Sequence, residues 1–183
     1  MIDRMKVLIG MATLLLLGAL MLIPSAVAGG QTTGAKSDSV LKAAEVGPKL
    51  LPDKVFFGGQ VAPVQMRNAG GVHFSDNSYT LAALVDSAGY SAEARQKYQG
   101  YLLSEVALEI QGHKLPAGAY GIGFLKDGKF VVMDIGAHDV VEAKSSQDAE
   151  MKRPVPLQVT GSSTAGQYRL YVGRDFVEWK RTQ

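Results

Sequence analysis

Short segments in which apolar and polar residues alternate follow one another from Leu50 to the end of the chain. This period of two is that of a half-buried β-strand, whose side chains point alternately to the two faces of a sheet. Turn-forming residues separate the segments at intervals of about 8–20 residues, a spacing typical of β-sandwiches and barrels. We therefore predict an all-β fold, a single antiparallel β-sandwich or barrel with one or two short helices.

Two hairpins are predicted from their turn residues: 72–85, which turns at 75–78, and 119–135, which turns at 126–128. Aspartate and asparagine close turns with their own side chains, and Asp-Gly tolerates the positive φ angles of a primed turn. The most regular strand covers 102–111, with one apolar and one mostly polar face. Further strands are predicted at 140–141, 155–159, 168–172 and 176–180.

Two segments depart from simple alternation. In Val55–Met66, Gly58-Gly59 suggests a bulge, and Pro63 has no amide to donate, so this strand lies at an edge or is broken. Within 119–124, large side chains alternate with alanine and glycine. The small residues indicate that another layer of structure approaches that face closely.

Helix signals are few. Residues 91–99 predict a helix capped by Ser91, lying across a sheet or its open end. Residues 39–46 are either a short helix or a loop, ended by Gly47-Pro48. We place this second segment in a flexible leader, 29–49, ahead of a domain covering 50–183.

The first 28 residues have the pattern of a signal peptide. Arg4 and Lys6 precede an uncharged apolar run at 7–23, and Ala26-Val27-Ala28 offers small side chains at a cleavage site. We expect export to the periplasm or the extracellular space, with a bacterial origin and no membrane contact after cleavage. The alternative is that the run stays uncleaved as an N-terminal membrane anchor.

Composition agrees with a single exported domain. Removing 28 of 183 residues leaves 155, enough to build a core without disulfides, and the chain contains no cysteine. The predicted signal peptide contains Asp3, Arg4 and Lys6, so its removal lowers the formal net charge from +2 to +1. The charges are mixed along the chain, and we expect no nucleic-acid partner.

Five residues are candidates for ligand binding. Tyr90, Tyr98 and Tyr101 surround the predicted helix, and either rim a pocket or fasten the helix to the sheet. His138 and Asp139 lie together in a predicted loop, near Asp134. Imidazole and carboxylate suit a divalent ion, but no His-x-His or His-x-x-x-His spacing supports a metal site, and we expect neither metal nor cofactor.

The segment Leu115 to Tyr120 reads L-P-A-G-A-Y and opens a strand followed by a hairpin. It resembles segments of uncharacterised exported β-rich bacterial proteins, domains of unknown function, over residues 102–135. Pro116 would set φ, Gly118 would free it, and Tyr120 would enter the core. The resemblance implies a related fold and no catalytic residue.

The sequence therefore favours a non-enzymatic binding or cell-envelope module. It would hold a small apolar ligand or an envelope protein, in the cleft between sheets or at a loop-rich end. One alternative is a hydrolase that uses loop residues near His138, Asp139 and Ser162. The other is a structural subunit that assembles through an exposed strand edge near Pro63.

Overall fold

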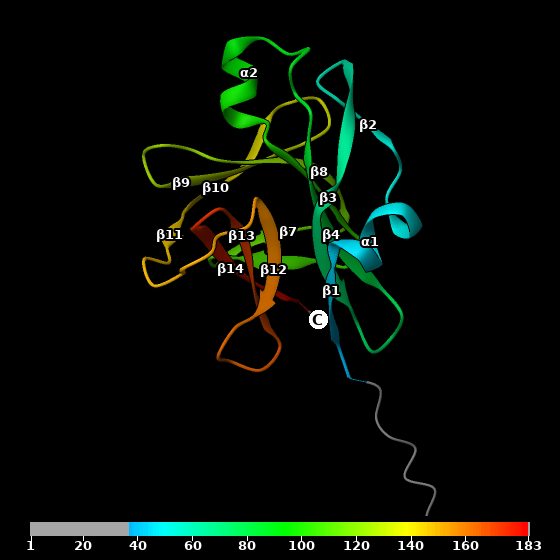
Figure 1. Cartoon of the computed structure of the whole chain (residues 1–183), viewed down its shortest axis with the longest axis vertical. Helices are drawn as coiled ribbons and strands as arrows, with labels where there is room; N and C mark the ends of the chain where they lie inside the picture. Colours follow the sequence, from blue (N-terminus) through cyan, green and yellow to red (C-terminus); the bar gives the residue numbers. More distant parts are fainter. Residues whose placement is uncertain (1–36, 183) are drawn as a thin grey trace, which may run out of the picture. The chain divides into compact units, whose positions relative to one another are not determined.

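The computed structural model describes residues 37–182, which form two antiparallel β-sheets and two short helices (Figure 1). Side chains from both sheets meet in one shared core, as in a β-sandwich. The all-β class predicted from the alternation is confirmed. The signal peptide predicted at 1–28, and the leader up to residue 36, lie outside the described residues.

The first sheet has eight strands in the order β1-β3-β4-β5-β8-β9-β10, and β2 pairs with one end of β3. Its strands are β1 Ser39–Lys42, β2 Lys54–Phe57, β3 Gln60–His73, β4 Tyr79–Val85, β5 Gly100–Ser104, β8 Gly118–Phe124, β9 Lys129–Met133 and β10 Asp139–Lys144. All of these pairs are antiparallel.

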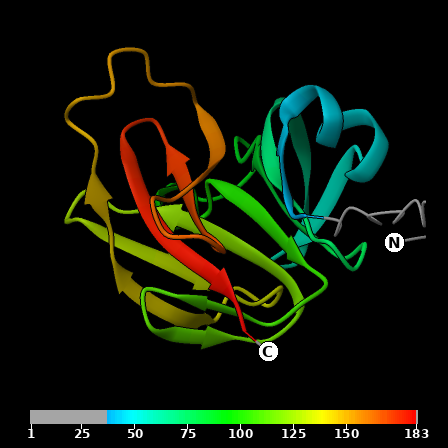
Figure 2. The same cartoon turned by 90° about the horizontal axis from the view of Figure 1, so that it is seen from below.

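The second sheet has six strands in the order β12-β13-β14-β6-β7, with β11 paired to β14. Its strands are β6 Leu108–Ile110, β7 His113–Leu115, β11 Ser146–Gln147, β12 Leu157–Gly161, β13 Gln167–Val172 and β14 Asp175–Arg181. The helices are α1 Ala43–Leu50 and α2 Ala92–Lys97. The chain changes sheet after β5, after β7 and after β10. In Figure 2 the red C-terminal strands cross in front of the green and yellow-green strands, with the blue-to-cyan N-terminal elements to their right.

The single strand predicted at 102–111 is wrong, because it divides between β5 and β6 in different sheets. The alternation continues through the crossover, since the inner faces of both sheets point into the same core. Leu102, Val106 and Leu108 are all buried there. At the crossover the Ser104 hydroxyl donates to the carbonyl of Val106 (2.7 Å), which satisfies a buried polar group.

Both predicted hairpins form. The β3–β4 hairpin turns at 75–78, where the Asp76 carboxylate accepts the N–H of Ser78 (3.1 Å). The β8–β9 hairpin turns at 126–128. Among these three residues only Gly128 has a positive φ (76°), so the predicted two-residue primed turn is replaced by a longer one.

The bulge predicted at Gly58-Gly59 is a turn. These residues have φ angles of 55° and 80° and join β2 directly to β3. Two consecutive positive φ angles match the primed turn whose twist suits a two-residue hairpin.

The edge position predicted for Pro63 is also wrong. Lys54 of β2 pairs with Pro63 on one side, and on the other the Pro63 carbonyl accepts the N–H of Asp86 (2.8 Å). The alternative, a broken strand, agrees with the register, which shifts between Val64 and Ala69. A proline in this place lacks only a donor, and its carbonyl still pairs.

The helix near residue 92 is confirmed and the earlier one is displaced. Ser91 accepts the N–H of Ala94 (3.2 Å) and caps α2, as predicted. Residues 39–42, expected in a helix or loop, form β1, and α1 follows it. The described part of the expected leader is therefore built into the fold. No helix within residues 37–182 has the length and apolarity needed to cross a membrane.

Central strands of the first sheet, such as β4 and β9, are buried on both faces. Phe130 and Val132 point into the core between the two sheets, which we call the inter-sheet core. The intervening Val131, and Met133, point into a second core on the opposite face. This second core is covered by residues of α1, of the β2–β3 hairpin and of the segment after α2, namely Val46, Val55, Phe57 and Tyr98.

One face of β8 carries only glycine and alanine, and this lets residues of the second core lie directly against its backbone. A Cβ at Gly121 would overlap the ring of Phe57, and one at Gly123 would overlap the carbonyl oxygen of Lys97. The prediction that another layer approaches this strand is confirmed, and that layer is formed by β2 and the end of α2.

The L-P-A-G-A-Y segment is the crossover from β7 to β8. Gly118 has no positive φ, so its predicted conformational role is wrong. Its role is spatial, because a Cβ there would lie 2.9 Å from the Tyr120 hydroxyl oxygen. Tyr120 is half-buried against the inter-sheet core, and its hydroxyl donates to the carbonyl of Pro116 (2.9 Å).

Candidate functional site

The three candidate tyrosines lie in or against the second core. Tyr98 is 0% exposed and its ring stacks on Phe57, with centroids 3.9 Å apart. Tyr90 is buried, and its hydroxyl donates to the carbonyl of Phe57 (2.9 Å). Tyr101 is half-buried beside them. Burial raises the pKa of all three hydroxyls. This arrangement fastens α2 to the first sheet.

His138 and Asp139 point to different partners. The Nδ1 of His138 lies 3.0 Å from a carboxylate oxygen of Asp134, and the His138 backbone N–H donates to the same carboxylate. These hydrogen bonds lower the pKa of Asp134. Asp139 instead pairs with Lys97 (2.6 Å) and ties β10 to α2. The two neighbours therefore do not form one site.

The structure does not bring together the residues of the hydrolase alternative. The Ser162 hydroxyl donates to Glu178 (3.2 Å) on the outer face of the second sheet. In the described part of the chain it forms no hydrogen bond with His138 or Asp139. Within residues 37–182, no three histidine, aspartate or glutamate side chains are grouped to hold a metal ion.

A hollow lies between the free edges of the two sheets. We call it the inter-sheet groove, and it has a volume of about 480 Å³. It is lined by 40–43 of β1 and α1, by Arg67 and Ala69 of β3, and by Val155 and β12. Ligand pockets commonly have volumes of about 300–1,000 Å³, so this groove has the size of a small-molecule site.

The groove lies between two terminal strands. β1 ends the first sheet and β12 ends the second, so within residues 37–182 no further strand is hydrogen-bonded to the outer edge of either. Gly70 of β3 allows β12 to come close, since a Cβ there would lie only 3.0 Å from the backbone nitrogen of Val159. The two sheets therefore meet at Gly70 and leave an open channel beside it.

The groove has an apolar lining and cationic margins. Leu157 and Val159 are buried in its β12 wall, while Val40 and Val155 remain 38% and 41% exposed at its lips. Large exposed aliphatic side chains that share one hollow mark a surface that gains from being covered.

The charged side chains of the lining are both basic. They are Lys42, the last residue of β1, and Arg67 of β3, and the lining contributed by the described residues contains no carboxylate. Within residues 37–182 neither cation takes part in an ion pair. Glu45 accepts the backbone N–H of Lys42 (2.9 Å) at the start of α1 and is not part of the lining.

No pattern in the sequence identifies this set of residues as a group. Lys42 lies in the segment expected to be a leader, Arg67 in an irregular strand, and Leu157 in a third region. Only the pairing of β1 with β3 and the approach of β12 bring them together. The general expectation of a cleft between sheets did anticipate the place.

Comparisons with protein-family models, with curated proteins and with solved structures found no match to this chain. The resemblance of residues 102–135 to exported β-rich proteins therefore stays a prediction.

Proposed function

We propose that this chain is an exported, non-enzymatic binding module that holds a slender apolar ligand in the inter-sheet groove. The observation that carries the proposal is the apolar lining between two free strand edges, with exposed valines at both lips. A ligand that covers these side chains gains about 0.8 kcal/mol for each methylene group removed from water.

A small molecule suits this groove better than a protein strand. An added strand would need the free backbone edge of β12, at a spacing of about 4.8 Å. The β12 backbone at Val159 already lies against Gly70, so a partner strand has no room at that point. A flexible alkyl chain needs no backbone pairing and follows the available channel.

Export is the part of the proposal that depends on the N-terminal sequence. The predicted signal peptide at 1–28 favours a periplasmic or extracellular site of action. A free mature N-terminus near Gly29, found by sequencing protein recovered from its native host, would support export, and an intact Met1 would contradict cleavage.

The groove is tested by filling it. Ala43 lines the groove and Ala44, the next residue of α1, is exposed and does not line it. We expect Ala43→Trp to weaken binding of decanol about tenfold or more, because the indole occupies the space of the alkyl chain. Ala44→Trp should leave the affinity unchanged.

Isothermal titration calorimetry with purified wild type and both variants measures this difference. Circular dichroism and thermal unfolding confirm that both variants are folded. Failure of the wild type to bind decanol, or equal binding by both tryptophan variants, contradicts the proposal.

A further inference from the structure

The inter-sheet groove is polarised along its length. Val40 supplies an exposed apolar side chain from β1, and Lys42 follows where β1 gives way to α1. Lys42 pairs in register with Gly70, and Arg67 lies three residues before Gly70 on the same strand. Both cations therefore belong to the α1 end of the groove.

The position of Arg67 depends on the irregularity of β3. Between Val64 and Ala69 the register of β3 with β4 shifts, so this stretch leaves the regular ladder. Arg67 lies within it, is exposed, and lines the groove. The lining therefore contains two positive charges, Lys42 at the β1–α1 junction and Arg67 in the interrupted part of β3.

We propose that the ligand is a long-chain carboxylate, whose alkyl chain lies along the apolar lining and whose head group is held by Lys42 and Arg67. This inference rests on the proposed function and names the class of ligand. A guanidinium presents paired N–H donors that match a carboxylate, and an ammonium adds a second charge-assisted hydrogen bond. Because the described lining contains no carboxylate, no anionic side chain there competes with the ligand for these two cations.

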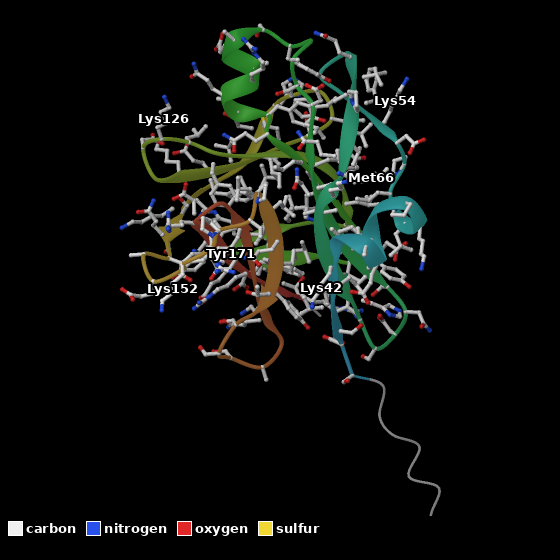
Figure 3. All side chains as sticks on the ribbon, viewed as in Figure 1. Lys42, Lys54, Met66, Lys126, Lys152 and Tyr171 are labelled. Atoms are coloured by element: carbon white, nitrogen blue, oxygen red, sulfur yellow. The ribbon has the colours of Figure 1, made fainter. Side chains whose placement is uncertain are left out.

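Figure 3 shows Lys42 beside β1, well separated from Lys54 and Lys126 at the opposite end of the view. Lys54 and Lys126 are exposed, and within residues 37–182 neither forms an ion pair. They supply a control in which the same net charge is removed away from the groove.

The experiment compares two ligands of equal chain length, decanoate and decanol, at neutral pH and low salt. Wild type should bind decanoate more tightly than decanol. The double variant Lys42→Gln/Arg67→Gln should lose about five- to tenfold in decanoate affinity, as expected for two partly exposed ion pairs, and nothing in decanol affinity. The control Lys54→Gln/Lys126→Gln should behave as wild type.

Two further measurements test whether the charge of the head group contributes to decanoate affinity. Raising the salt concentration should weaken decanoate binding and spare decanol, because exposed charges are screened. Acetate, which has the head group alone, should not displace decanoate at equal concentration.

The outcomes separate the two proposals. Equal affinity of wild type for decanoate and decanol, or a preference that survives in the Lys42/Arg67 variant, overturns the carboxylate inference and leaves the groove as an apolar site. Binding of neither ligand overturns the proposed function together with the inference.

Discussion

The hydroxyl groups of Tyr90 and Tyr98 meet different surroundings although their rings are in contact, with centroids 5.2 Å apart. The Tyr90 hydroxyl donates to the Phe57 carbonyl. The Tyr98 hydroxyl is buried and has no hydrogen-bond partner among the described residues. Because burial without a partner costs about 1–3 kcal/mol, the second hydroxyl works against folding while its ring supports it.

Removing each hydroxyl should therefore have opposite effects. We expect Tyr98→Phe to leave the free energy of unfolding unchanged or to raise it by about 1 kcal/mol, because a buried unpaired polar group is lost. Tyr90→Phe should lower it by about 1 kcal/mol, since the Phe57 carbonyl loses its donor. Urea unfolding followed by fluorescence measures both.

The two variants control for each other, because each removes one oxygen atom from the same core. A loss of stability in Tyr98→Phe as large as that in Tyr90→Phe would show that the Tyr98 hydroxyl does have a partner.

At the scale of elements, Asp38 joins three segments that are distant in sequence. Just before β1, its carboxylate accepts the backbone N–H of Ser75 in the β3–β4 turn (2.9 Å) and the hydroxyl of Tyr168 in β13 (2.8 Å). Burial raises the pKa of Asp38, but the hydrogen bonds from Tyr168 and Ser75 and the charge of Arg181 outweigh it, so the pKa is lowered.

Replacement of this carboxylate should therefore destabilise the fold in a pH-dependent way. We expect Asp38→Ala to lower the free energy of unfolding at pH 7 by about 1 kcal/mol, a modest value because Asp38 is exposed. The pKa is lower in the folded state, so the contribution is complete above the unfolded pKa of about 3.9 and is lost as the pH falls through the folded value.

Unfolding of wild type and variant in urea at several pH values measures this effect. Their stability difference should shrink as the medium becomes acidic. Asp53→Ala is the control, because the Asp53 side chain is exposed and only its backbone carbonyl bonds to Val64. An Asp38 effect that is constant with pH would contradict the role of the charged form.

Individual elements were predictable where a local rule decides them. Turn residues located the β3–β4 and β8–β9 hairpins, and Ser91 located the start of α2. The rules failed where the partner was distant. Val40 and Leu41 were predicted to lie in a helix or a loop, because no neighbouring residue indicates that they pair with β3. The break between β5 and β6 was hidden because both strands face the same core.

For the folded unit as a whole, the unexpected contribution comes from residues 37–50. β1 closes one edge of the first sheet, and Val46 of α1 is 0% exposed in the second core. Burying one such side chain is worth about 1.5–3 kcal/mol. The domain therefore begins before Leu50, where the alternation starts.

Two truncations test this boundary. We expect a chain that starts at Ser37 to unfold cooperatively. A chain that starts at Leu50 should lose about 3 kcal/mol or more, because it lacks Val46, Asp38 and β1. The fluorescence of Trp179, which is buried in the inter-sheet core, reports the transition. Equal stability of the two chains would show that β1 and α1 do not stabilise the domain, and would contradict this boundary.

The residues of the groove could not be predicted from the sequence, because they depend on how the two sheets pack against each other. A cleft is set by the distance between two sheets, and Gly70 sets that distance here. An isolated glycine in a strand predicts a close approach, but it does not say which distant segment approaches. The sequence predicts the kind of place where a ligand would lie, and the residues of that place follow only from the fold.

The burial of β9 on both faces has a consequence for how its pairing is chosen. In a strand with one buried face, a register shift of one residue moves the apolar side chains to the solvent face. The hydrophobic effect therefore selects the correct register. Here Val131 and Val132 would merely exchange places, at little hydrophobic cost. Correct alignment of β9 must instead be selected by side-chain volume, because the same slip would move Phe130 and Met133 into the opposite cores.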